Sequence, residues 1–170
     1  MIYVIGLIIL ICVICITVLF FKYIKLKDIE KSLDMCSLSI EEALEKKLKL
    51  VEELLKLIDN EQIKKKFKYE KESSIYERED VLFNVSFEIN KFVKEEKQTI
   101  KGKKNKNKSN LSDELLGKIR DLNEMEEGLD GLKDFYNTNV LNYNETFLKK
   151  YYHKIFAALK FPTYKSFSSI

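Results

Sequence analysis

A stretch rich in tyrosine and asparagine, toward the end of the chain, carries the side chains best suited to form a specific site. Tyr136 and Tyr143 are seven residues apart, as are Asn137 and Asn144, so each pair follows one face of a helix. Their hydroxyl and carboxamide groups can bind a ligand. They can also bond across a helical bundle and fix its register, as buried polar residues do in coiled coils. We favour this structural role, because no reactive side chain stands nearby in the sequence.

The rest of the sequence contains few side chains that could form a reactive site. His153 is the only histidine, so neither a histidine-based metal site nor a catalytic histidine pair can be built. Acidic pairs such as Glu52 and Glu53 are adjacent, and adjacent residues of a helix point in different directions. Cys36 stands alone and the other two cysteines lie in an apolar run, so no disulfide framework is expected. Because a glycine-rich phosphate loop and a nucleophile elbow are also missing, we expect no catalytic, cofactor-binding or metal-binding residue.

These side chains follow an apolar N-terminal run. Residues 2–21 contain no charged group, and a helix of that length is about 30 Å long, which matches the hydrocarbon core of a bilayer. A cleaved signal peptide would have a basic segment before the run and small residues at its end, but the run closes on large residues at 18–21. We therefore predict an uncleaved transmembrane helix over residues 2–21.

Lysines flank only one end of this run. Lys22, Lys25 and Lys27 follow it, whereas only the terminal amine precedes it. Lysine and arginine close to a membrane span are retained on the cytoplasmic side. The sequence thus predicts a single-pass protein of the cell membrane, with the N-terminus outside and residues 22–170 forming a cytoplasmic domain.

The composition limits the partners that the chain can have. Its 30 basic side chains are balanced by 27 acidic ones, which argues against a nucleic-acid binder, because such proteins concentrate basic charge on one face. The abundance of lysine, isoleucine and asparagine is typical of an AT-rich bacterial genome. We expect membrane lipids around the N-terminal helix and proteins as the other partners, with no nucleic acid and no metal.

Apolar residues recur at steps of three and four after the run, which predicts amphipathic helices. The first stripe keeps one phase, so we expect a helix over about residues 22–60 that continues from the membrane span. Ser39 and Glu42 could cap a second helix after a break, but the unbroken stripe favours one helix. The polar residues 60–72 are interpreted as the end of this helix and a turn.

Three further helices are expected. Ser74 and Glu77 form a capping box at the start of the first of them. Alternating apolar residues over 81–89 would also suit a strand, but a lone strand in a helical protein has no partner, so a helix is preferred. The predicted helices cover about residues 74–97, 111–148 and 151–160.

Three glycines lie within the long helix of residues 111–148. Gly117, Gly128 and Gly131 each weaken a helix by up to about 1 kcal/mol relative to alanine. We interpret their presence as a sign that a neighbouring element approaches closely.

Residues 98–110 contain several lysines, no acidic residue and almost nothing apolar, so we predict a flexible basic loop. Two roles stay open for it. The loop can be a solvated linker, or its lysines can reach anionic lipid headgroups, where each contributes about 1 kcal/mol within a Debye length. The lysines concerned are Lys101, Lys103, Lys104, Lys106 and Lys108.

One segment resembles the signature of a known family. Residues 126–144 read E-x-x-L-x-x-x-K-x-x-Y-N-x-x-V-x-x-Y-N, which is similar to the LemA signature E-x-x-I-x-x-x-R-x-x-Y-N-x-x-V-x-x-Y-N. The corresponding residues are Glu126, Leu129, Lys133, Tyr136, Asn137, Val140, Tyr143 and Asn144. Residues 155–167 look like the closing aromatic segment of the family. Residues 40–55 resemble an earlier segment, in which Lys47, Lys49 and Glu52 replace the arginine, aspartate and proline of the family.

The LemA family has an N-terminal membrane helix and a helical bundle, and its members are associated with membrane-protein quality control without an established biochemical function. The resemblance and the helix pattern predict an all-α fold, with a single N-terminal transmembrane helix followed by an antiparallel up-and-down bundle of three to four helices. We interpret the signature residues as structural. The expected function is a non-catalytic scaffold or adaptor for protein partners at the bacterial inner or plasma membrane, and the alternative is an enzyme with an unrecognised site.

Overall fold

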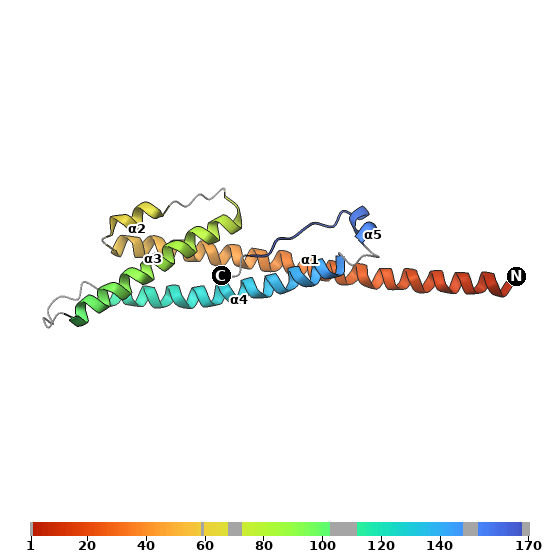
Figure 1. Ribbon diagram of the computed structural model, residues 1–170, viewed down its shortest axis with the longest axis horizontal. Coiled ribbons are helices and arrows are strands. Elements are labelled where there is room, and N and C mark those ends of the chain that lie inside the picture. Colours follow the sequence, from red (N-terminus) through yellow and green to blue (C-terminus); the bar gives the residue numbers. More distant parts are fainter. Residues whose placement is uncertain (1, 59, 68–72, 103–111, 148–152, 168–170) are drawn as a thin grey trace. The chain divides into compact units, whose positions relative to one another are not determined.

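The computed structural model describes residues 2–58, 60–67, 73–102, 112–147 and 153–167. All regular structure in these residues is helical, which confirms the predicted all-α class for this part of the chain. The helices are α1 (Ile2–Leu57), α2 (Glu61–Lys66), α3 (Ile75–Gly102), α4 (Asp113–Phe147) and α5 (His153–Ala158) (Figure 1). The chain divides into two compact units: unit 1 is Met1–Ser37 with Asp134–Ile170, and unit 2 is Leu38–Lys133.

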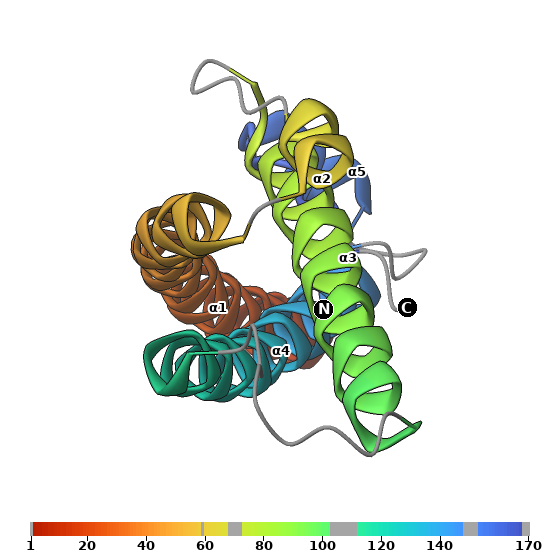
Figure 2. The same ribbon diagram turned by 90° about the vertical axis from the view of Figure 1, so that its left-hand side faces the viewer.

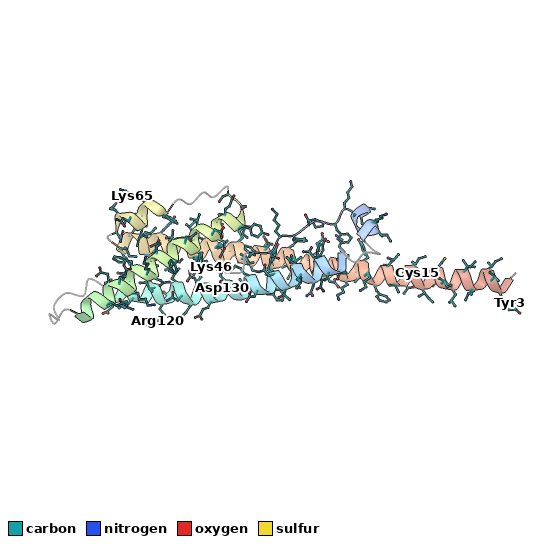
Figure 3. The ribbon with its side chains drawn as sticks, in the orientation of Figure 1. Tyr3, Cys15, Lys46, Lys65, Arg120 and Asp130 are labelled. Carbon is teal, nitrogen blue, oxygen red and sulfur yellow. The ribbon has the colours of Figure 1, made fainter. Side chains whose placement is uncertain are left out.

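The first helix, α1, is unbroken from Ile2 to Leu57, as its single apolar phase predicts (Figure 1). Its first part is exposed and apolar, with side chains such as Tyr3 and Cys15 standing off the helix (Figure 3). Within the described residues, α1 is the one helix that is long and apolar enough to cross a membrane. The later part of α1 buries a stripe that comprises Leu26, Leu33, Cys36, Ile40, Leu44, Leu48, Val51, Leu54 and Leu55.

Unit 1 combines the start of α1, the end of α4, α5 and an extended segment, residues 161–167, which we call the C-terminal strap. Its core contains Leu26, Leu33, Cys36, Tyr136, Val140, Tyr143, Phe161 and Phe167. Helix α5 ends at Ala158, two residues before the predicted end at 160 and four residues before Pro162, which cannot continue a helix. Residues 151–152 of the predicted span lie outside the described residues.

Unit 2 combines the rest of α1 with α2, α3 and the first part of α4. Its apolar core contains Ile40, Leu44, Leu48, Val51, Leu54, Leu55, Ile58, Ile63, Leu82, Val85, Ile89, Val93, Leu115, Ile119, Leu122 and Leu129. The predicted capping box at the start of α3 is confirmed. The Ser74 backbone N–H donates to Glu77 Oε2 at 2.9 Å, and the Glu77 backbone N–H donates to Ser74 Oγ at 3.3 Å.

Two element boundaries differ from the predictions. Residues 61–66, expected in a turn, form α2, because the Asn60 side chain accepts the N–H groups of Gln62 and Ile63 and the Ile63 side chain is buried. Helix α2 lies beside α3 (Figure 2). Helix α3 continues to Gly102, so residues 98–102 of the predicted loop are helical; Gly102 is the first strong helix breaker in that stretch. The remainder of the predicted loop, residues 103–110, lies outside the described residues.

The prediction that the glycines of α4 mark a close approach is wrong for the described part of the chain. A Cβ atom added at Gly117, Gly128 or Gly131 would meet no described atom within 4 Å. Gly128 and Gly131 lie on the exposed side of the helix, where no neighbour restricts the size of a side chain. The antiparallel bundle and its likeness to the LemA family stay predictions.

Candidate functional site

The signature residues of α4 are divided between the two units. Glu126, Leu129 and Lys133 belong to unit 2, whereas the tyrosines and asparagines belong to unit 1. Each group has its own partners, and the two sets of contacts differ in kind.

In unit 2, the signature residue Lys133 lies in a cluster of buried charge. Its Nζ is 2.8 Å from Glu79 Oε1 and 2.8 Å from Asp130 Oδ1, and Glu79 is only 3% exposed. Burial lowers the pKa of the Lys133 amine, but the hydrogen bonds to Asp130 and Glu79 outweigh it, so the net shift of this pKa is upward. Lys133 therefore stays charged at neutral pH and ties α4 to α3.

A second buried lysine ties α4 to α1 in the same unit. Lys47 is 1% exposed, and its Nζ lies 2.9 Å from Oε1 of Glu126, the first residue of the signature. More exposed ion pairs join Arg78 to Glu41 and Lys118 to Glu53. These ion pairs join the helices within the unit.

In unit 1, Asn137 binds the backbone of the C-terminal strap. Its Oδ1 accepts the Phe167 N–H at 2.8 Å, and its Nδ2 donates to the Phe167 carbonyl at 3.2 Å. The carboxamide thus satisfies both polar groups of a single residue, as a neighbouring strand would. The expected bonds across a helical bundle are instead bonds to this segment. Val140 is buried on the same helix and Asn144 is half-buried.

The two tyrosines that follow complete this set of contacts. Tyr143 Oη donates to the Pro162 carbonyl at 2.7 Å, and Tyr164 Oη donates to Asp34 Oδ1 at 3.0 Å. Burial, with the carboxylates of Glu30 and Asp34, raises the pKa of Tyr143 to about 12. Burial and the hydrogen bond to Asp34 also raise the pKa of Tyr164. Both phenols therefore remain protonated donors at neutral pH and do not act as nucleophiles.

Aromatic contacts anchor the strap at three points. The rings of Phe167 and Tyr136 meet edge to face with centroids 5.3 Å apart, and those of Tyr164 and Tyr143 do so at 5.2 Å. Phe161 meets Tyr23 of α1 at 5.8 Å. The Lys27 ammonium lies 5.1 Å from the centroid of the Phe161 ring, within the range of a cation–π interaction.

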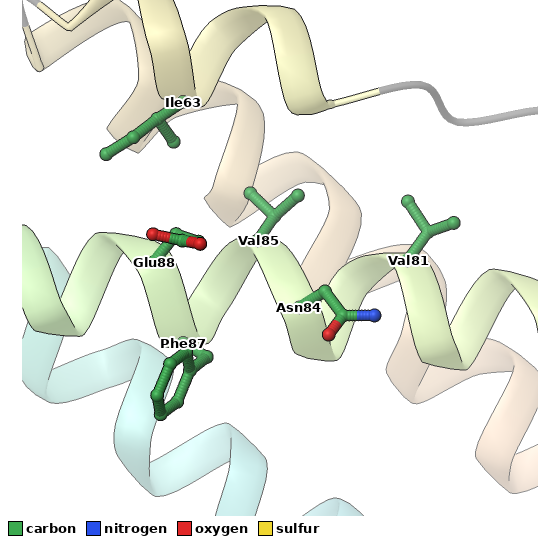
Figure 4. A pocket seen from close by; sticks show the side chains of 6 residues that line it. All are labelled: Ile63, Val81, Asn84, Val85, Phe87 and Glu88. Carbon is green, nitrogen blue, oxygen red and sulfur yellow. The ribbon is translucent and has the colours of Figure 1, made fainter.

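Unit 2 has a separate groove between α2 and α3, with a volume of about 430 Å³. Ile63 of α2 points toward α3, whose Val81 and Val85 face the same side (Figure 4). Phe87, which also lines the groove, is 60% exposed. The sequence interpretation missed this groove because it missed α2, although Asn60 followed by an acidic residue is a recognisable helix start.

The other candidate residues are only partly described. The backbone of Lys101 is in α3, whereas Lys103, Lys104, Lys106 and Lys108 lie outside the described residues, so the lipid contact stays a prediction. His153 begins α5. Among the residues that the structure describes, no group of three histidine, cysteine or acidic side chains could hold a metal ion.

Comparison with known proteins finds no family model, no curated protein and no solved structure that matches this chain. The LemA resemblance thus rests on the sequence motifs alone. The described hydrogen-bonding groups of unit 1 contact the C-terminal strap, whereas unit 2 has an open groove.

Proposed function

We propose that the chain is a membrane-anchored, non-catalytic scaffold or adaptor that holds protein partners at a bacterial inner or plasma membrane. The observation that carries this proposal is the continuity of α1. The helix passes without a break from an uncharged, exposed segment into residues that are buried in both units. An apolar helix segment that is exposed on all sides is stable in lipid and unfavourable in water. The later part of α1 has an apolar stripe on one face, which needs protein neighbours to cover it.

The placement of the chain follows from the residues after the apolar segment. Lys22, Lys25 and Lys27 would hold this end of the helix on the cytoplasmic side, with the N-terminus outside and residues 22–170 in the cytoplasm. The Tyr23 and Phe161 pair would then lie close to the membrane surface, where aromatic side chains are enriched.

The proposed architecture is a LemA-like antiparallel bundle of three to four helices. Its support comes from two ion pairs at positions of the resemblance: Lys47, which replaces the arginine of the family, pairs with Glu126, and Lys133 pairs with Glu79. Buried pairs of this kind fix the register between helices. A bundle with its polar groups satisfied in this way suits a scaffold whose surfaces, rather than an enclosed site, meet the partner.

Site-specific photo-crosslinking in intact membranes tests this function. A benzophenone side chain at Phe87, in the groove between α2 and α3, is expected to capture one defined protein. The same group at Arg120, an exposed polar position of α4, is the matched control and is expected to capture none. Removal of residues 2–21 should then release the captured partner from the membrane fraction.

Two results would contradict the scaffold. One is the same set of adducts at Phe87 and Arg120, which would indicate random collisions. The other is a partner that stays with the membrane to the same extent when the apolar segment is removed.

A further inference from the structure

The C-terminal strap is buried with a period of three. Phe161 and Phe167 are buried and Tyr164 is half-buried, whereas the residues between them are exposed. An extended polyproline II segment has three residues per turn, so it presents every third side chain to one face. The burial of every third residue in the strap matches this spacing. The strap contacts residues of α1 and α4 that we call the strap site: Tyr23, Lys27, Asp34, Tyr136, Asn137 and Tyr143.

The strap site binds the strap partly through the backbone of the strap. Asn137 binds the N–H and the carbonyl of Phe167, and Tyr143 binds the carbonyl of Pro162. None of these three bonds involves a side chain of the strap. Contacts of this type are used by proteins that bind extended peptides, because they tolerate different side chains.

The side chains of the strap site favour aromatic residues of the ligand at three positions. Phe167 packs on Tyr136, Tyr164 packs on Tyr143, and Phe161 packs on Tyr23 beside the Lys27 ammonium. At the middle position, the Asp34 carboxylate also accepts a hydrogen bond from the Tyr164 hydroxyl. The preferred ligand is accordingly extended, with aromatic side chains at every third position and a tyrosine in the middle.

The attachment of the strap to the rest of the chain allows exchange. Ile155 of α5 and Leu159 of the turn that follows this helix are 43% and 53% exposed, so neither side chain is buried in the core. Lys160, which joins α5 to the strap, has a φ of 55°, in the left-handed region that a residue with a Cβ rarely adopts. Release of the strap would relax this residue.

We propose that the strap site of unit 1 is an exchangeable peptide-binding site, in which an extended segment of a partner protein, with aromatic residues at every third position, replaces the chain's own strap. The proposal rests on the adaptor function and names the chemistry of its partner. In the resting protein the strap blocks the site, so partner binding and strap release are the same event.

The experiment uses the full chain in detergent and a fluorescent peptide of sequence KFPTYKSF, which corresponds to residues 160–167. In one variant, Phe161, Tyr164 and Phe167 are all replaced by serine. These substitutions remove the aromatic side chains of the strap and leave the residues of the strap site unchanged. This variant is expected to bind the peptide saturably in a fluorescence-anisotropy titration. A peptide of the same composition with its aromatic residues adjacent should bind at least about tenfold more weakly.

Two asparagines of α4 provide a matched pair of second substitutions. Asn137→Ala, added to the serine variant, should weaken peptide binding about tenfold or more, because two net hydrogen bonds are lost. Asn139→Ala should leave it unchanged, because the Asn139 carboxamide donates to the Phe135 carbonyl of its own helix at 3.0 Å. Equal affinities for the two variants, or no binding by a serine variant that keeps its helical content, would overturn the proposal.

A second measurement on the unaltered chain covers the case in which the serine variant fails to fold. The tethered strap has an effective concentration on the order of mM, so the peptide is added above that level. Displacement should accelerate hydrogen exchange of the Phe167 amide, which is bonded to Asn137. Unchanged exchange in the strap would overturn the proposal, and so would a dimer formed by exchange of straps between two copies in place of peptide binding. Neither result would affect the crosslinking at Phe87, which tests the adaptor function separately.

Discussion

At the scale of single residues, the buried charges of unit 2 give the helices one defined register. Lys47 and Lys133 reach carboxylates on other helices, and Glu79 is buried with its partner. A buried ion pair contributes little net stability compared with an apolar pair, but removal of one partner leaves a costly isolated charge. These residues therefore exclude alternative registers more than they add stability.

Replacement of Lys133 by methionine tests this role. The substitution keeps the apolar volume and leaves Glu79 buried without its cation, so the free energy of unfolding should fall by about 3 kcal/mol or more. Chemical denaturation followed by circular dichroism measures the change. Lys118→Met, which breaks the exposed pair with Glu53, is the control and should give no measurable loss. Similar losses in the two variants would mean that burial of the pair is unimportant.

The phenol of Tyr143 makes stability depend on pH in the alkaline range. Its pKa is raised from an ordinary value of 10.0 to about 12 in the folded chain, so the folded state keeps the proton longer than the unfolded state does. The stabilisation is complete below pH 10 and is lost as the pH rises toward 12. Between pH 10 and pH 12, the unfolding free energy should fall with pH less steeply in Tyr143→Phe than in the unaltered chain. The difference between the two slopes should correspond to at most one proton per molecule. Parallel pH profiles for the variant and the unaltered chain would contradict this assignment.

At the scale of elements, a helix starts where a capping box is followed by a new apolar stripe. The capping box of Ser74 and Glu77 starts α3, and the unbroken apolar phase of α1 prevails over the similar pair Ser39 and Glu42. The same two residue types thus have different roles, because only one pair precedes a new stripe.

Substitution of the two serines separates these roles. Ser74→Ala removes a helix cap and should lower the free energy of unfolding by about 1 kcal/mol. Ser39→Ala lies inside α1, where alanine is the better helix former, so no loss is expected. Thermal unfolding of both variants measures the difference. A loss at Ser39 equal to that at Ser74 would indicate a helix end within α1.

The elements that could not be predicted depend on contacts between distant residues. Helix α2 has a recognisable start at Asn60, but its one buried apolar side chain, Ile63, gives no periodic signal that a helix follows. The strap was expected to be aromatic, but its bonds to Asn137 and Asp34 join residues 30 and 130 positions apart. Periodicity within a helix identified Tyr136 and Tyr143 as one face, yet it carried no information about the segment that covers this face. The buried partner of Lys133 was missed for the same reason.

At the scale of the whole molecule, the proposed anchor determines where every other contact operates. In the function proposed above, the exposed apolar segment at the start of α1 would span the membrane, and the lysine cluster directly after it would keep the two units on the cytoplasmic side. In that arrangement the groove at Phe87 and the strap would face cytoplasmic partners. An opposite orientation would remove both surfaces from those partners.

Labelling of Ser166→Cys with a membrane-impermeant maleimide tests this placement most directly. Position 166 is exposed on the strap, the substitution is nearly isosteric, and native Cys36 is buried, while Cys12 and Cys15 lie in the proposed membrane segment. In intact bacterial cells that express the chain, the reagent should leave the variant unlabelled, and labelling should appear once the membrane is permeabilised. Equal labelling of the introduced cysteine before and after permeabilisation would contradict a cytoplasmic, membrane-anchored scaffold.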